Sequence, residues 1–531
     1  MIFSASSRRG SRWLARWLQL IAALGLVCST PAWAHVGSPD IYADGNAGPY
    51  RLFVTVRPPL VIPGVAEIEV RADPASANGA LVSGIEIAPI PLTGEASLHP
   101  PVADAMKQSG QDKQFFTGAL WIMASGSWQV RFTVKGNQGQ GVLSIPVPAT
   151  SSSTKGMQAG LGILLGGLGL LLVVGVIGIV GAAARDAQLP PGATAGAAGR
   201  KRVLIAMGVA LVLMVGAVVF GEIWWKGEAD AYGKYVYKPL TMQAVLAPGQ
   251  SPGLPDGQVL KLSVEDPGWL KSRRLDDFVP DHDHLMHLYL LREPGLDLVY
   301  HLHPEQIAPG GFQLPLPAVP AGLYQVYADV VHATGFPETL VARVELPEIA
   351  GRPLAGDDAK GTVQALDSLQ PGPNGCPINN VAGPQFRLPD GFTMIWNNPA
   401  KLSAKTPQVF AFTLLDPSGK PPSDMALYMG MVGHAAFVKD DGTVFAHVHP
   451  SGTVSMAALM MAAAQNQQLK AGTMAGMKMT GMDGASQIPN TVGFPYGFPT
   501  AGAYRIFVQM KHGQTVETGA FDACADSAHS D

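Results

Sequence analysis

The sequence predicts a mainly β protein in which three exported β-sandwich domains, of immunoglobulin-like or cupredoxin-like type, are joined to a two-helix transmembrane hairpin. Three observations predict this. Short alternating apolar runs, separated by turns rich in Pro, Gly and Asn, fill most of the chain. Two long, almost uncharged apolar stretches lie before the middle of the chain. A length of 531 residues leaves room for three or four domains.

Residues 1–34 have the features of a secretory signal peptide. Four arginines precede the apolar run Leu18–Val27, and Ala32-Trp33-Ala34 provides a small-x-small cleavage site. Removing this segment deletes four positive charges and no acidic ones, so the formal net charge moves from −4 to −8. A chain of this charge is a poor candidate for binding nucleic acid, and we expect none as a partner.

Cysteine usage agrees with export. Cys28 leaves with the signal peptide, so the mature chain keeps only Cys376 and Cys524. In an oxidising compartment these two are expected to form a disulfide, which would close a loop of about 150 residues and stabilise the fold by roughly 2–5 kcal/mol. The alternative is that one of them is a thiolate copper ligand, although neither lies beside a histidine motif.

Residues 35–150 predict the first β-sandwich. Turns rich in Pro, Gly and Asn separate six short alternating runs, the number expected of an antiparallel sandwich of about a hundred residues. The predicted strands are Tyr50–Val56, Ala66–Ala72, Ser83–Pro89, Leu120–Met123, Trp128–Val134 and Gly141–Val147.

Two short motifs in this domain resemble known periplasmic domains. The segment from Gly126 to Phe132, GSWQVRF, resembles the Gly-x-Trp-x-Val-x-Val strand of YtkA-like and FixH-like domains. Cleavage after Ala34 makes His35 the mature N-terminus, and an N-terminal histidine resembles that of CopC-like copper carriers. The resemblance implies a copper-binding β-sandwich, in which the α-amino group and imidazole of His35 chelate copper together. An arbitrary cleavage position is the alternative, and His99 is the only other histidine of this domain.

The two apolar stretches predict transmembrane helices over 157–184 and 203–225, after a polar linker at 151–155. The loop 185–202 between them contains four basic residues and one acidic residue, which places it in the cytoplasm. We therefore expect a bacterial inner (cytoplasmic) membrane protein whose N- and C-terminal domains lie in the periplasm. A buried core hairpin is the alternative.

Histidines gather in the domain predicted over 232–347. The segment from Asp281 to Pro304 holds five of the thirteen histidines and reads as two strands, Met286–Arg292 and Leu298–His303, joined by a Pro-Gly turn. His301 and His303 are two apart and share one strand face. The turn brings His287 opposite position 302 or so, within the reach that imidazoles need to share a metal ion.

The same pattern returns in the last domain, predicted over 376–531 after a linker at 348–375. An Asp441-Gly442 turn sets His434 opposite His449 and places His447 on the same face. A constant offset of 180 then aligns the segments beginning at 321 and 501. This internal repeat carries His332 onto His512 and Asp329 onto Gln509.

Each repeat is therefore predicted to hold one four-histidine metal site. The ligands would be His287, His301, His303 and His332 in the first and His434, His447, His449 and His512 in the second. Counting back from the first histidine of each hairpin aligns His282 and His284 with Met429 and Met431. All four are secondary candidates for metal ligands, and they would give the first site nitrogen donors and the second site sulfur donors. The alternative is that the histidines only brace the hairpins.

The second repeat carries an insertion of 34 residues between its third and fourth histidines, within 455–490. Residues 455–468 predict a short helix. The segment that follows carries four methionines in a flexible context, and thioether sulfur is a soft ligand that suits Cu(I). The alternative is a methionine-lined apolar flap. These methionines are Met474, Met477, Met479 and Met482.

The sequence favours a membrane-anchored periplasmic protein that handles copper by buffering, resistance or delivery to a copper enzyme. Imidazole also suits zinc, and the methionines tilt the choice towards copper. The alternatives are a metal-dependent enzyme, or a scaffold without metal that binds a partner in the membrane. No paired carboxylates, nucleophile elbow or phosphate loop supports catalysis, and Asp329 is the one plausible acid near a site. The histidine clusters lack cysteine, which argues against a blue-copper centre.

Overall fold

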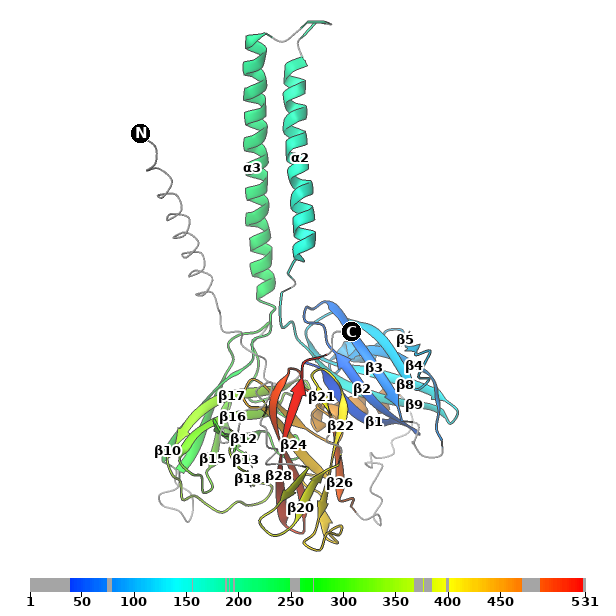
Figure 1. The fold of residues 1–531 in the computed structure, drawn as a ribbon, viewed down its shortest axis with the longest axis vertical. Helices are drawn as coiled ribbons and strands as arrows, with labels where there is room; N and C mark the ends of the chain where they lie inside the picture. Colours follow the sequence, from blue (N-terminus) through cyan, green and yellow to red (C-terminus); the bar gives the residue numbers. More distant parts are fainter. Residues whose placement is uncertain are drawn as a thin grey trace, which may run out of the picture.

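A computed structural model gives a mainly β fold with several sheets and a two-helix hairpin. The β units gather at one end of the hairpin (Figure 1). The structure describes residues 39–73, 79–154, 156–186, 189–190, 192–193, 196–248, 258–270, 272–366, 376, 384–397, 401–469 and 488–528.

The N-terminal unit (residues 39–154) contains two sheets, ordered β1-β2-β3-β7-β6 and β5-β4-β8-β9. One hydrophobic core joins them, with Val54 and Phe116 from the first sheet and Ile87 and Phe132 from the second. All six predicted strands are present. The additional strand β1 was not predicted because its sequence, IYADGNA, contains turn-forming residues. The elements are β1 (Ile41–Ala47), β2 (Tyr50–Arg57), β3 (Gly64–Ala72), β4 (Val82–Pro91), η1 (Glu95–Leu98), β5 (Asp104–Ala105), β6 (Lys107–Gln108), β7 (Phe115–Ile122), β8 (Gly126–Gly136) and β9 (Gly139–Ala149).

The hairpin consists of α2 (Ala159–Asp186) and α3 (Ala197–Gly233), which run side by side away from the β units (Figure 1). Both helices are long and apolar enough to cross a membrane, and only 0% and 6% of their most apolar windows are buried. Helix α3 extends beyond the predicted span at both ends.

The first histidine unit (residues 234–366) has a four-stranded sheet, β10-β11-β15-β14, and a five-stranded sheet, β17-β16-β12-β13-β18. Its core lies between them, with Leu262 from one sheet and Leu288 and Val326 from the other. Strand β18 comes from the predicted linker and completes the second sheet. The strands are β10 (Thr241–Pro248), β11 (Gln258–Glu265), β12 (His287–Glu293), β13 (Leu298–Leu302), β14 (Glu305–Ala308), β15 (Gly311–Pro315), β16 (Gly322–Val331), β17 (Pro337–Leu346) and β18 (Ala359–Thr362).

The second histidine unit (residues 384–528) has a sheet β19-β20-β22-β26 and a larger sheet β21-β28-β27-β24-β25, in which β23 also pairs with β27. The predicted disulfide is confirmed: Cys376 is bonded to Cys524, with Cα atoms 5.9 Å apart. The elements are β19 (Gln385–Arg387), β20 (Thr393–Trp396), β21 (Leu402–Ser403), β22 (Gln408–Leu415), β23 (Met425–Ala426), β24 (Gly433–Lys439), β25 (Phe445–Val448), α4 (Met456–Leu469), β26 (Thr491–Tyr496), β27 (Gly502–His512) and β28 (Thr515–Asp526).

The larger sheets of the two histidine units have matching strand order: β17-β16-β12-β13 corresponds to β28-β27-β24-β25. The strand register agrees as well, because His287 pairs with Asp329 in the first unit and His434 pairs with Gln509 in the second. Asp329 and Gln509 are the two positions that the offset of 180 relates in the sequence. The turns before the hairpins also match. His282 and Met429 both have φ of 50°, a left-handed conformation that is uncommon without glycine.

These two larger sheets face each other across a second apolar layer, which includes Tyr289 and Tyr327 from one unit and Phe445 and Phe507 from the other. The N-terminal unit contacts the second histidine unit. The Asp44 N–H donates to the Ser451 carbonyl. Helix α4 lies against β9, with Asn466 hydrogen-bonded to Arg131 and Ser144. All three β units therefore meet around the ends of the histidine hairpins.

Candidate metal centre

Eight of the thirteen histidines form one cluster where the two larger sheets face each other. The sequence predicted two separate sites, one in each unit. Instead, ring contacts cross the interface: the His447 centroid lies 5.3 Å from that of His287 and 5.5 Å from that of His301. The cluster comprises His282, His284, His287, His301, His303, His434, His447 and His449.

Strand alternation explains why the hairpins deliver histidines to this interface. Along β12, Leu288 and Leu290 point into the core of the first unit, so His287 points to the opposite face. The apolar interface layer takes Tyr289 and Leu291 from that same face. Strand β24 repeats the pattern from the other side. The predicted register of this second hairpin is confirmed, because Ala435 pairs with Val448 and places His434 opposite His449.

His287, His301 and His303 form a first group, in which one nitrogen from each ring lies within 4.8 Å of the others. The Nε2 atom of His287 lies 2.9 Å from the Asp281 carbonyl oxygen. That oxygen can only accept, so Nε2 carries the hydrogen and Nδ1 keeps its lone pair. This Nδ1 lies 3.1 Å from His301 Nε2.

The tautomer of His301 follows from its neighbours. Its Nδ1 lies 2.9 Å from Gln509 Oε1 and 3.3 Å from the Tyr428 hydroxyl. Tyr428 donates its only hydrogen to the Asp357 carbonyl, so it accepts from His301. His301 therefore carries its hydrogen on Nδ1, and two lone pairs face each other at 3.1 Å. A cation between them would turn this repulsion into attraction.

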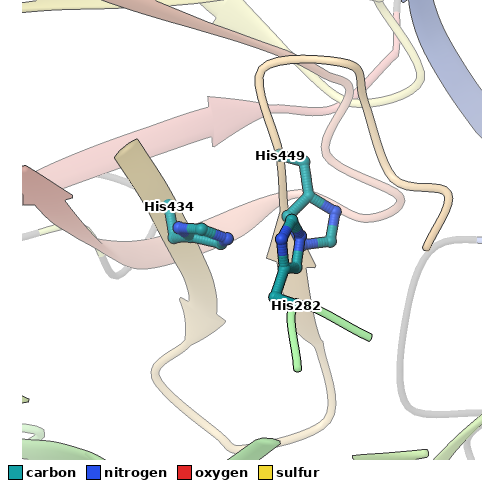
Figure 2. A group of neighbouring side chains, drawn as sticks. All are labelled: His282, His434 and His449. Atoms are coloured by element: carbon teal, nitrogen blue, oxygen red, sulfur yellow. The ribbon is translucent and has the colours of Figure 1, made fainter. Parts of the chain in front are cut away.

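His282, His434 and His449 form a second group, also with one nitrogen each within 4.8 Å of the others. Figure 2 shows these rings pointing toward one another from the turn before β12, from β24 and from the end of β25. His449 Nδ1 lies 3.2 Å from the Val454 carbonyl, to which it donates. His434 is 0% exposed, and neither of its ring nitrogens has a hydrogen-bond partner.

Carboxylates and one amide orient the imidazoles from outside. His303 Nδ1 lies 3.2 Å from Asp358, and His284 Nε2 lies 3.4 Å from Asp357. Two further contacts cross the interface between the histidine units, one in each direction. Asp329 of the first unit holds His447 of the second at 3.3 Å, while Gln509 of the second unit holds His301 of the first. Carboxylate–histidine contacts of this kind fix the ring orientation of metal ligands.

Burial keeps six of the clustered imidazoles neutral at pH 7, the form that binds metals. It lowers the pKa of His303 to about 3 and that of His449 to about 4. Burial also lowers the pKa of His287, His301, His434 and His447 well below the usual value, and neighbouring histidines add to the effect in all four. The same burial raises the pKa of the Asp329 carboxyl to about 7.

Several buried ring nitrogens of the cluster lack any hydrogen-bond partner. Leaving one buried polar atom unpaired costs about 1–3 kcal/mol, so a protein retains such a set only where another ligand satisfies it. Lone pairs of imidazoles that converge in a buried site fit a metal ion. The atoms are His282 Nε2, His303 Nε2, His434 Nδ1 and Nε2, His447 Nε2 and His449 Nε2.

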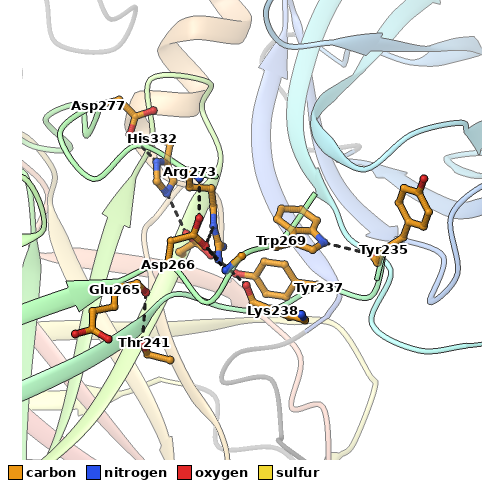
Figure 3. A network of polar contacts seen from close by, with 12 residues as sticks. Tyr235, Tyr237, Lys238, Thr241, Glu265, Asp266, Trp269, Arg273, Asp277 and His332 are labelled. Carbon is orange, nitrogen blue, oxygen red and sulfur yellow. Dashed lines mark hydrogen bonds and ion pairs between the residues drawn. The ribbon is translucent and has the colours of Figure 1, made fainter. Parts of the chain in front are cut away.

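His332 does not join the cluster predicted for it. Its Nδ1 lies 2.8 Å from Asp277 (Figure 3). Its Nε2 lies 2.9 Å from Glu338, which also binds Arg273 at 2.6 Å. Burial lowers the pKa of His332, but hydrogen bonds to Glu338 and Asp277 outweigh it and leave the pKa raised. The physical reason is strand parity: His332 follows Ala328 and Val330 on the core face, whereas Asp329 faces the interface.

His512, the corresponding residue of the second unit, also lies apart from the cluster. Its Nδ1 lies 3.3 Å from Asp424, and its Nε2 lies 3.3 Å from Glu517 and 3.6 Å from Asp390. Burial, with Asp390 nearby, raises the pKa of Glu517 to about 7. Each unit thus repeats an Asp–His–Glu contact set on its own core side. The acids were missed because nothing in the local sequence connects them with a histidine.

The other predicted ligands have varied positions. Both secondary candidates His282 and His284 lie in the cluster, whereas Met429 packs with Tyr428 and Ala359 and Met431 is also buried. The remaining ones fall outside the described residues, namely His35, Met474, Met477, Met479 and Met482.

Sequence reasoning missed the residues around the ligands. Tyr428 occupies the position of Asp281 in the repeat, and Asp357 and Asp358 come from the predicted linker. The paired acids could have been suspected from their adjacency, but only the fold places them beside histidines.

The match to a known protein family falls within the second histidine unit. Residues 387–527 match a family described as a domain of unknown function (DUF8832), which covers less than a third of the chain. No curated protein sequence matches.

Among solved structures, invasin, a bacterial integrin-binding protein, is 10% identical with a TM-score of 0.14, and the match covers 90% of this chain and 60% of that one. Latent PorU from Porphyromonas gingivalis is 8% identical with a TM-score of 0.14, covering 92% and 34%. An endo-fucoidan hydrolase of glycoside hydrolase family 107 is 9% identical with a TM-score of 0.15, covering 89% and 43%. The chain thus spans 60% or less of these proteins, and likenesses at such scores carry no argument.

Proposed function

We propose that this chain is a membrane-anchored periplasmic protein that binds copper in the eight-histidine cluster and serves to buffer it or deliver it. The observation that carries the proposal is the set of buried imidazole nitrogens without hydrogen-bond partners, gathered in two groups of three histidines. Preoriented imidazoles in a buried interface form a strong donor set for a late first-row metal.

Copper is favoured over zinc by the soft thioether donors that the sequence places in the insertion of the second unit. Imidazole suits both metals, while thioether sulfur suits Cu(I). The methionine-rich insertion follows helix α4, whose Ala457 N–H donates to the Asp281 carboxylate at 2.7 Å. Asp281 also holds His287 through its carbonyl. The helix that leads into the insertion therefore starts beside the cluster.

The signal peptide, the two apolar helices and the disulfide support a periplasmic location on an inner-membrane anchor. We also infer that each pair of sheets is a β-sandwich of immunoglobulin-like or cupredoxin-like type, because one core fills the space between the sheets of each histidine unit. The CopC-like and YtkA-like resemblance of the N-terminal unit, and His35 as a further copper ligand, stay predictions.

A metal-dependent enzyme is the second candidate, and burial argues against it. His287, His301, His434 and His449 are all 3% exposed or less, which leaves little room for a substrate beside the metal. Buried ligands instead suit a protein that retains its ion. A scaffold without metal would have to tolerate the unpaired nitrogens.

Elemental analysis of the full-length protein, purified in detergent, tests the proposal. The wild type should carry copper that a His434→Ala, His303→Ala double variant has lost. The matched control is His99→Ala, which removes an exposed histidine from the N-terminal unit. Copper bound equally by the cluster variant and the wild type, or no bound metal in either, would overturn the proposal.

A further inference from the structure

We infer that the cluster is a dinuclear centre, in which each group of three histidines holds one metal ion and His447 lies between the two ions. This inference rests on the proposed function and adds the number of ions and their unequal roles.

Distances separate the groups. A metal–imidazole bond is about 2.0–2.1 Å long, so nitrogens that share one ion lie within about 4.2 Å of each other once bound. Within each group the nitrogens already lie within 4.8 Å. Ring centroids show the same grouping: they lie 4.8–5.3 Å apart within each group, against 6.1 Å for His282 and His287 and 6.5 Å for His301 and His434 between the groups. Each group is therefore more compact than the space between the groups, and small shifts can close each group on its own ion.

The free lone pairs divide in the same way. In the first group His287 presents Nδ1, whereas His301 and His303 present Nε2, because their other nitrogens meet Asp281, Gln509 and Asp358. In the second group His282 and His449 present buried Nε2 atoms, and His434 is unpartnered at both nitrogens. Each group is thus a complete three-nitrogen set.

His447 is placed to serve either ion. Asp329 holds its Nδ1, and its Nε2 is buried without a partner. Its ring centroid lies 4.6 Å from that of His449 and 5.4 Å from that of His434, against 5.3 Å from that of His287. It is therefore nearest to the second group while still in contact with the first.

Charge around the cluster suits bound cations. The carboxylates of Asp329, Asp357 and Asp358 contact clustered histidines, and the Asp281 carboxylate interacts electrostatically with His449. Among the described residues, Arg352 pairs with Asp358. Acids at this buried interface favour a cationic ligand over a neutral one.

The two ions would have different structural roles. All three ligands of the first group come from the first histidine unit. The second group takes His282 from the first unit and His434 and His449 from the second. The second ion therefore links the two units across their interface, and its loss should loosen the interface more than loss of the first.

Copper counting on variants of the full-length protein in detergent tests this inference. His301→Ala with His303→Ala disables the first group, His434→Ala with His449→Ala disables the second, and His99→Ala is the control. Each double variant should bind one copper ion fewer than wild type, and the combination two fewer. Using differences cancels any copper held elsewhere on the chain.

If either double variant loses all the copper that the combination loses, one shared ion occupies the cluster and the inference is wrong, while the proposed function survives. If no variant loses copper, the proposed function fails as well. Should a variant not fold, wild-type protein loaded with Cu(II) gives the answer. Two adjacent ions couple magnetically and give less electron paramagnetic resonance signal than the bound copper predicts, whereas a full signal contradicts a dinuclear centre.

Discussion

Acid should unfold the metal-free protein at a pH set by the buried histidines. The folded protein holds the pKa of His303 near 3 and that of His449 near 4, whereas an unfolded chain titrates histidine near 6.5. Below pH 6.5 the unfolded state therefore binds protons that the folded state does not. Stability is fully present above that pH and is lost as the pH falls towards 4.

The size of the effect follows from linkage. At pH 5.5 each of these two histidines costs roughly 1 to 2 kcal/mol relative to pH 7.5, or about 3 kcal/mol together. The other four buried histidines with lowered pKa act in the same direction. A loss of about 3 kcal/mol is a large part of the stability of an ordinary domain.

Thermal melting of the metal-free and copper-loaded protein at pH 7.5 and 5.5 measures this. The Tm of the metal-free form should fall by roughly 6–12 °C, at about 2–4 °C for each kcal/mol. Copper should reduce the fall, because a bound ion stabilises only the folded state. A His303→Gln, His449→Gln variant should show a smaller fall than wild type, while His99→Ala should match wild type. An equal Tm at the two pH values would refute the reasoning.

Three further predictions concern other contacts. Arg505 is 0% exposed, pairs with Asp522 and donates to the Gly295 and Leu296 carbonyls of the first unit. Arg505→Met leaves the Asp522 carboxylate unpaired and should therefore destabilise the fold by about 3–5 kcal/mol in a melting experiment. The control Arg343→Met, at an exposed position, should change the stability little. Asp281→Ala removes the acceptor of the Ala457 N–H at the start of α4 and should cost about 1 kcal/mol. Asp283→Asn is the control, because asparagine tolerates the positive φ of this exposed position, and an equal Tm for the two variants would contradict the prediction. Leucine at the four methionines of the insertion should lower Cu(I) affinity in a competition titration and leave Tm unchanged, whereas a lower Tm with unchanged affinity would identify a packing flap; the positions are Met474, Met477, Met479 and Met482.

Much of the fold could be predicted from local patterns. The predicted helix over 455–468 corresponds to α4, the strands of the first predicted hairpin lie within one residue of β12 and β13, and the second predicted hairpin corresponds to β24 and β25. These elements have strong periodicity and clear turn signals, and such signals depend only on neighbours in the sequence. Strand β18 could not be predicted, because a short strand such as AKGT gains its structure from pairing with β13.

The arrangement of the site required the fold. A sequence repeat indicates that two units carry equivalent residues, but it does not indicate whether the units face each other. Here they do, so the equivalent positions 329 and 509 each hold a histidine of the other unit. The histidines that the repeat predicted in two separate sites therefore lie in one cluster.

Strand parity, combined with the strand register of the structure, excludes the fourth ligands from the cluster. His332 lies three residues after Asp329, and an odd separation on a strand places two side chains on opposite faces. Since Asp329 pairs with His287 in the register, a histidine on its opposite face points into the core of its own unit and away from the cluster. The same reasoning applies to Gln509 and His512. The cluster instead takes His282 and His284 from the turn before β12, where a left-handed backbone turns the chain back toward the interface.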